Sequence, residues 1–382
     1  MSRRILLVLA CLIVLGGLAS EARADYLAYA VSDKGEEKPL PEDLSPILGK
    51  KATELLKLKW SEFGGKKIRV GVREAENESG IQSFHYSGPG GSYDSSAYAT
   101  TVPVQGIDAL LASVLTEANR FRVLERSDEL DNVLYEQDLG DSGRVAKPSA
   151  AKIGKVLGAQ YLVQVVVNSY EPNVGGKKAG LGGFSRKLKM LGGAKGGKNK
   201  SYVQMTFKLI NSETSEIMAS EVVEATISEL SFGLGAVGWG GAGALGGFLS
   251  GYAKTPIGQA VMATINIGVL ELIKQVGNLP VTGSVVKVED SRVIVNLGQD
   301  AVEAGDTLTA VSQGEDFVDP DTGLSLGAEE EEVGKLKVTS VKEKYCYAEP
   351  VGFELSALSR GDKILTDAEP QPLQFGPAWE NK

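Results

Sequence analysis

Three long β-prone runs limit the possible folds of this chain more than any other feature. They span residues 161–170 (YLVQVVVNSY), 202–210 (YVQMTFKLI) and 216–227. The second run alternates apolar and polar residues, and the first and third are rich in β-branched residues. A short turn at 211–214 joins the last two runs, and a Gly/Lys-rich excursion separates the first two. Because turns and hairpin arms connect antiparallel strands, we expect the three runs to be antiparallel neighbours in one sheet.

Helical and strand patterns alternate around these runs and predict an α/β (α+β) core. We expect strands at 68–72 and 121–124, and helices at 41–63, 107–115, 150–157 and 255–277. Thr255 and Pro256 have the N-cap and N1 chemistry of a helix start. Ser127 is the expected cap of a further helix. The residues expected to bury one side of that helix are Leu130, Val133, Leu134 and Leu139.

The domain boundaries follow from shifts in composition along the 382 residues. We expect a signal peptide at 1–24, an N-terminal helical extension at 25–66 and an α/β domain at 67–279. Two Gly-rich arms leave that domain, at 171–201 and 229–254. Short strands with Gly/Asp turns predict a small all-β barrel or sandwich at 280–367. Residues 368–382 are expected to be a loose tail.

The N-terminus has the pattern of an export signal. Arg3 and Arg4 precede an uncharged apolar stretch at 5–18, and Ala22 and Ala24 frame a small-x-small cleavage site before Asp25. A second interpretation is a lipoprotein, because residues 8–11 (VLAC) form a loose lipobox. Cleavage there would leave a short apolar core and an apolar mature N-terminus. We therefore expect an exported protein of the periplasm or outer membrane, whose one remaining thiol, Cys346, has no intrachain partner.

Charge and motifs argue against several classes of function. The net charge is −9, whereas a general nucleic-acid binder would carry a basic domain. Residues 192–198 (GGAKGGK) match a P-loop except that Asn199 replaces Ser/Thr, and two GxGxxG matches lie in a glycine-rich segment. Neither context fits a nucleotide site. The single histidine, His85, has no partner of a metal or catalytic set in the sequence. We expect no cofactor, no metal and no enzymatic activity.

The two arms and one long loop are the candidate functional segments. The arm at 171–201 contains eight Lys/Arg within residues 175–200 and no acid, which suits an aqueous lumen, anionic headgroups or an acidic partner. The arm at 229–254 has no charge between 230 and 252. It could form barrel strands, a helical hairpin with a GxxxG pair at Gly243 and Gly247, or a partner-binding loop. Its candidate membrane- or partner-facing residues are Phe232, Leu234, Trp239, Phe248 and Tyr252.

The sequence resembles the CsgG family, which comprises the curli secretion channel and its relatives. The resemblance covers residues 68–276 and is most specific at Val123–Arg126 (VLER) and Gly158–Val163 (GAQYLV). It implies an α/β periplasmic core, and two hairpins from each subunit of a ring contributed to one outer-membrane barrel. It also implies a loop that narrows the channel with aromatic and amide side chains.

The constriction loop of the curli channel reads YPASNFSTAVP, and residues 93–103 here read YDSSAYATTVP. By this resemblance Tyr93 matches the constriction tyrosine, Tyr98 stands in place of phenylalanine, and Ala97 replaces the asparagine. The implied function is a non-enzymatic ring at the outer membrane that secretes or anchors an extracellular polymer subunit, with exported polypeptide as its cargo and no nucleotide. The alternative is a soluble or peripheral periplasmic scaffold without a pore.

Overall fold

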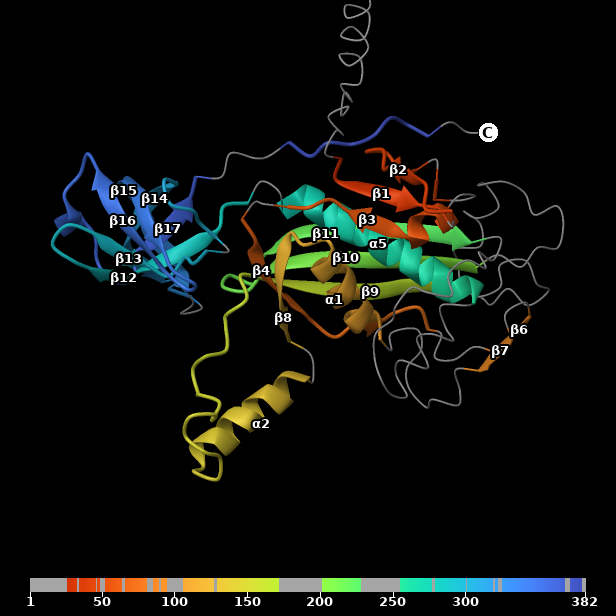
Figure 1. The fold of residues 1–382 in the computed structure, drawn as a ribbon, viewed down its shortest axis with the longest axis horizontal. Coiled ribbons are helices and arrows are strands. Elements are labelled where there is room, and N and C mark those ends of the chain that lie inside the picture. The colour runs from red at the N-terminus through yellow and green to blue at the C-terminus, as the bar shows by residue number, and fades with distance from the viewer. Residues whose placement is uncertain are drawn as a thin grey trace, which may run out of the picture.

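The computed structural model describes residues 26–32, 34–45, 47–48, 52–63, 66–80, 85–88, 91–94, 106–126, 129–171, 201–227, 255–276, 279–299, 301–318, 320–321, 325–367 and 372–379. Figure 1 shows a central sheet with a long helix on one face, a β-barrel beyond one end of the sheet, and a helix that stands apart. Mixed helices and strands confirm the α+β class expected from the sequence.

The central sheet has the strand order β11-β10-β9-β4-β8, and β5 also pairs with β9. The strands β9, β10 and β11 pair antiparallel, as the three long runs predict, whereas β4 lies parallel to both β8 and β9. The bounds of these strands are β4 Ile68–Val72, β5 Glu76–Asn77, β8 Phe121–Glu125, β9 Tyr161–Glu171, β10 Ser201–Asn211 and β11 Ile217–Ile227.

Helix α5 (Pro256–Val276) is the centre of the core and lies on the same face of the sheet as α1 (Ile107–Glu117) (Figure 1). The helix starts as its sequence predicts, because Thr255 Oγ1 accepts a hydrogen bond from the Gly258 N–H at 3.1 Å. It is long and apolar enough to cross a membrane, but 94% of its most apolar window is buried in the fold. A sheet on one side and the N-terminal residues on the other account for that burial.

The N-terminal segment corrects the expected helix at 41–63. It contains a small sheet of order β2-β1-β3 and one turn of 3-10 helix, η1. The apolar residues of the predicted helix do face the core, since Leu44, Leu55 and Leu56 are buried. Contact with α5 holds the segment in an irregular path: Asn266 Nδ2 donates to the Leu55 carbonyl at 2.7 Å. The bounds are β1 Ala28–Val31, β2 Glu37–Pro39, η1 Ala52–Leu56 and β3 Leu58–Trp60.

The end of the chain returns to this N-terminal sheet, which corrects the expectation of a loose tail. Trp379 is 7% exposed and its Nε1 donates to the Pro39 carbonyl at 2.9 Å. Lys38 Nζ lies 4.0 Å from the centre of the same indole ring. Gly376 N–H donates to the Leu40 carbonyl at 2.8 Å. Residues 372–379 therefore tie the C-terminal end to the start of the fold.

The C-terminal module is a closed barrel of order β12-β13-β16-β15-β14-β17. The expected barrel or sandwich is thus a barrel, and closure leaves its six strands without an open edge. The strands β14 and β15 continue together into a long hairpin, paired as far as Val318 and Ser325. The bounds are β12 Thr282–Val288, β13 Val293–Val295, β14 Thr307–Val318, β15 Ser325–Val341, β16 Cys346–Val351, η4 Leu355–Ala357 and β17 Lys363–Thr366.

Helix α2 (Glu129–Asp141) differs from expectation in its surroundings. Its predicted apolar side is not buried as expected: Val133 is 45% exposed and Leu134 42%, and Leu130 and Leu139 are half-buried. Figure 1 shows the helix standing away from the sheet. The short helix expected at 150–157 does not form either, and those residues are irregular, with one turn at 153–154. The helical periodicity was a correct sign of a helix, but the described part of the chain leaves Val133 and Leu134 of its apolar side exposed.

Candidate functional site

The loop and both arms leave the core at one end of the sheet. Glu171, the last residue of β9, pairs with Tyr202, and Ser201 pairs with Ile227, the last residue of β11. The segment after β4 leaves at the same end, because β4 runs parallel to β9. We call this end, marked by Glu171, Ser201 and Ile227, the arm end. It brings together segments that are more than 100 residues apart in sequence.

Two buried tyrosines fix the base of the arm at 171–201. Tyr170 is 1% exposed and Tyr202 is 5% exposed. The Tyr202 hydroxyl donates to Glu224 Oε2 at 2.7 Å, so it also ties β10 to β11. Burial and the neighbouring Glu224 carboxylate raise the pKa of Tyr202 above its ordinary value. Sequence reasoning missed both residues as anchors, although their positions at the borders of the basic arm were a usable sign.

The long loop at 81–103 contains a short hairpin, whereas the sequence predicted only a loop. The strands β6 (His85–Gly88) and β7 (Gly91–Asp94) pair antiparallel, with Tyr86 opposite Tyr93. Pro89-Gly90 is a turn signal that predicts such a hairpin. The backbone of Tyr93, the first residue of the proposed constriction, therefore belongs to a paired strand.

Most of the other predicted site residues lie outside the described residues. These are the loop residues Ala97 and Tyr98, the cleavage residues Ala22, Ala24 and Asp25, and the arm residues Phe232, Leu234, Trp239, Phe248 and Tyr252. Their assignments stay predictions. What the structure adds is the position of the residues that flank them.

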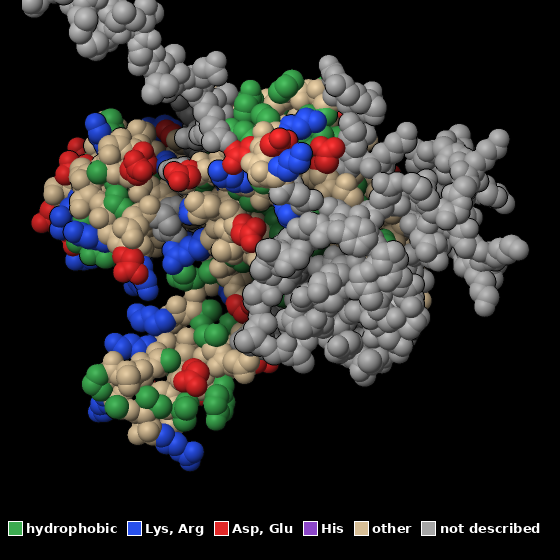
Figure 2. Space-filling model, turned by 45° about the vertical axis from the view of Figure 1, so that its right-hand side comes forward, with side chains coloured by type: hydrophobic (Ala, Val, Ile, Leu, Met, Phe, Trp, Pro, Cys, Tyr) green, Lys and Arg blue, Asp and Glu red, His purple; other side chains and the backbone are tan. Residues whose placement is uncertain are grey.

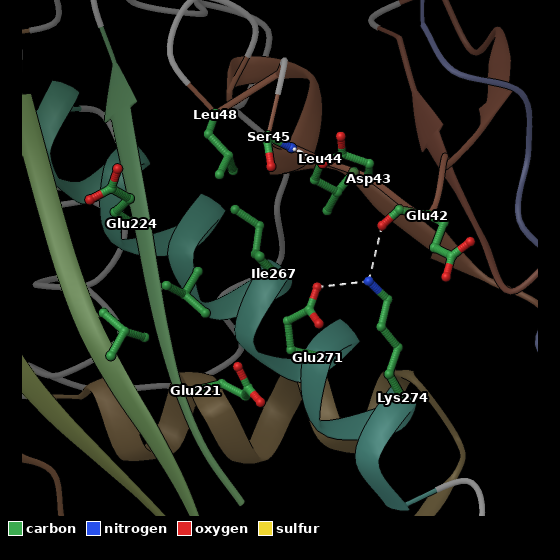
Figure 3. Close-up of a pocket in the computed structure, with 12 residues that line it drawn as sticks. Glu42, Asp43, Leu44, Ser45, Leu48, Glu221, Glu224, Ile267, Glu271 and Lys274 are labelled. Carbon is green, nitrogen blue, oxygen red and sulfur yellow. Dashed lines mark hydrogen bonds and ion pairs between the residues drawn. The ribbon is translucent and has the colours of Figure 1, made fainter. Parts of the chain in front are cut away.

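A groove of about 510 Å³ lies beside β11, between that strand, α5 and the N-terminal residues 42–48 (Figure 3). Leu44, Leu48 and Ile267 provide apolar groups, and Val222 of β11 is 61% exposed at its border. The carboxylates around it are Glu42, Asp43, Glu221, Glu224 and Glu271, against one cation, Lys274.

Local hydrogen bonds hold these carboxylates in place. Lys274 Nζ lies 2.8 Å from Glu271 Oε1 and donates to the Glu42 carbonyl at 3.0 Å (Figure 3). Gln275 Nε2 donates to Glu221 Oε1 at 3.1 Å. Hydrogen bonds from Ser45 lower the pKa of Asp43. The groove therefore has a negative rim above an apolar floor, which suits a cationic ligand with apolar groups.

No sequence motif pointed to this groove, because its residues come from three separated segments. Within the described ranges, no group of three or more His, Cys, Asp or Glu residues is arranged to hold a metal ion. The groove thus offers charge and shape for binding.

Comparisons with known proteins identify the family. The family described as "Curli production assembly/transport component CsgG" matches residues 52–296, more than half of the chain. A comparison with curated proteins finds no match.

Several solved structures match parts of this chain at low identity and low TM-score. The hypothetical protein CT253 from Chlamydia trachomatis is 10% identical, with 55% of this chain and 98% of that chain covered and a TM-score of 0.29. The PelC dodecamer from Paraburkholderia phytofirmans is 11% identical, with 54% and 90% covered and a TM-score of 0.24. Lipoprotein GNA1162 from Neisseria meningitidis is 16% identical, with 48% and 93% covered and a TM-score of 0.20. These likenesses are too remote to bear on function, and the assignment rests on the family match: the chain belongs to the CsgG family of curli production assembly/transport components.

Proposed function

We propose that this protein is an exported, non-enzymatic CsgG-like component that forms a ring at the outer membrane and passes or anchors an extracellular polymer subunit. The observation that carries the proposal is the arm end. A core of the CsgG family places the roots of both arms and of the loop that contains Tyr93 at one end of its sheet. A ring of such cores would bring the arms of all subunits to one side.

The chemistry of the two arms supports different positions in such a ring. The arm at 229–254 is uncharged between 230 and 252, so it can enter lipid without the cost of burying charge. The eight cations of the arm at 171–201 are expected at headgroups or in an aqueous lumen. Transport through the ring would be passive, with the loop at 81–103 as its gate and with Tyr93 and Tyr98 packed against their copies around the ring.

The test is membrane fractionation followed by imaging. Cells expressing the full chain are lysed, and the membranes are washed with carbonate; we expect the protein to stay in the outer-membrane fraction. A variant in which 229–254 is replaced by a short Gly/Ser linker should move to the soluble fraction. Negative-stain imaging of detergent-extracted protein should then show rings.

The opposite results are equally informative. Full release of the unaltered protein by carbonate would contradict the membrane ring and support a periplasmic scaffold. Rings that conduct ions in planar bilayers, with higher conductance after Tyr98→Ala, would support a constriction at this loop. Unchanged conductance in that variant would remove Tyr98 from the constriction.

A further inference from the structure

Helix α2 carries acidic and apolar side chains that stay exposed in the described part of the chain. Val133, Leu134 and Tyr135 are all exposed. The helix carries five acidic residues and no basic one, and Asp131, Glu136, Asp138 and Asp141 are exposed. Figure 2 shows the lobe that contains α2 clear of the body, with hydrophobic side chains on its surface. We call these residues the acidic helix surface.

Helix α2 is also expected to be only marginally stable without a partner surface. A helix of 13 residues is marginal by itself in water, and most helical stability in proteins comes from packing of an apolar face. Asp138 and Asp141 lie in or beside the last turn, where the helix dipole disfavours negative charge. A basic, partly apolar surface placed against this helix would correct both defects.

The segment that follows α2 has the complementary chemistry. Residues 142–158 contain no acid, and their four cations, Arg144, Lys147, Lys152 and Lys155, are exposed. Ile153 is 59% exposed and Val156 39%. We call these residues the basic strip. It contacts α2 where Ala151 lies against Gly140 and where Ser142 donates hydrogen bonds to the carbonyls of Asp138 and Leu139. Because the apolar residues of both surfaces stay exposed, the two do not cover each other within one chain.

We propose that the acidic helix surface of one subunit binds the basic strip of a second copy of this chain. A second copy is the expected partner because every copy carries both surfaces. The two surfaces are opposite in charge, and both expose apolar side chains. Each subunit would then have one donor and one acceptor surface, and such head-to-tail contacts form a ring when the rotation between neighbours closes, and a filament when it does not. The inference rests on the proposed ring and names the contact that would build it.

The experiment reverses the charge of each surface in the full-length protein. One variant carries Asp131→Lys and Asp138→Lys, a second carries Lys152→Glu and Lys155→Glu, and a third combines all four substitutions. All four side chains are exposed, so the variants should fold, which circular dichroism checks. Glu213→Lys with Glu216→Lys, at the exposed turn between β10 and β11, is the control for a general change of charge.

Native mass spectrometry and sedimentation of the extracted protein give the readout. We expect each single-surface variant to weaken subunit association at least about tenfold, and the combined variant to restore it. The control should assemble like the unaltered protein. Added salt should weaken association of the unaltered protein, because the contact pairs exposed charges.

The outcomes separate the interface from the ring. If the unaltered protein assembles and both single-surface variants assemble equally well, the interface is wrong and the ring stands. If the unaltered protein is a monomer in membranes and in detergent, the proposed ring is wrong, and the proposed interface, which rests on it, is wrong as well. The interface is also wrong if the control variant loses subunit association as strongly as the single-surface variants. It is equally wrong if the combined variant does not restore association.

Discussion

Gly268 sets the distance between α5 and the central sheet. The ring of Phe207, a fully buried side chain of β10, occupies the space beside it. A Cβ atom at Gly268 would lie 2.2 Å from Phe207 Cζ, well inside van der Waals contact. The helix can therefore approach the sheet closely only with glycine at this position.

We expect Gly268→Ala to lower the free energy of unfolding by about 1–3 kcal/mol, because overpacking outweighs the gain in helix propensity. Urea unfolding measures the change. Gly158→Ala is the control: nothing lies within 4 Å of its Cβ position and its φ is not positive, so a change below about 0.5 kcal/mol is expected. Equal stability of the two variants would contradict this account of the contact.

Cys346 is a second residue whose surroundings decide its chemistry. It is fully buried in the barrel, and burial, together with the charge of Asp306, raises the pKa of its thiol to about 12. The folded protein should thus react slowly with thiol reagents at pH 8, whereas unfolded exported protein should give one thiol per chain. Two thiols would show that Cys11 is retained.

The raised pKa of Cys346 also predicts that the free energy of unfolding depends on pH. The folded state holds the thiol proton more tightly than the unfolded state, whose pKa is near 9.0. The free energy of unfolding is therefore unaffected by this group below pH 9 and falls as the pH rises from 9 toward 12. Cys346→Ala should remove this contribution to the decrease in the free energy of unfolding between pH 9 and pH 12. Thermal unfolding across that pH range measures it.

At the scale of elements, the capped start of α5 offers a direct test of the helix signals. Thr255 is 2% exposed and its hydroxyl oxygen accepts from the Gly258 N–H. We expect Thr255→Ala to cost about 1 kcal/mol and Thr255→Ser to cost much less, because serine also caps. Comparison of the two variants in urea separates the cap from the lost methyl group. If serine is no better than alanine, the cap has no part in stability.

The elements also show which features the sequence could predict. Periodicity and caps were sufficient for α5, for α1 and for the three long strands, because each of these elements buries one regular face against the others. The 41–63 segment has the apolar spacing of a helix, yet Leu55 and Leu56 reach the core from one 3-10 turn. The pattern shows which residues are buried and does not fix the backbone path between them.

The candidate sites were harder to predict for a different reason. In α2 the pattern of Leu130, Val133 and Leu134 correctly indicates a helix with an apolar side, but a sequence does not say which chain covers it. The groove beside β11 joins residues near 42, 221 and 271, and no local pattern links them. By contrast, the borders of the arms were visible in composition, and the pairing of Glu171 with Tyr202 places them together.

At the scale of the whole molecule, the barrel and the arm end lie at opposite ends of the core sheet. In Figure 1 the barrel lies beyond the end where α5 finishes, whereas β9 finishes at the arm end. Polar contacts between barrel and core include Lys66 Nζ with Asp306 Oδ2 at 2.9 Å and Gln160 Nε2 with Thr282 Oγ1 at 3.0 Å. This arrangement separates the barrel from the arm end, where the proposed ring would meet the membrane.

The closed barrel should therefore fold independently of the core. We expect residues 280–367 expressed alone to give a cooperative urea transition, and the full chain to give two transitions, one of which matches it. Trp379→Ala is the matched variant, because this side chain contacts Lys38 and Pro39 of the N-terminal sheet. Trp379→Ala should lower the free energy of unfolding of the core transition by roughly 3–5 kcal/mol and leave the barrel transition unchanged. A single transition that Trp379→Ala shifts as a whole would mean that barrel and core fold as one unit.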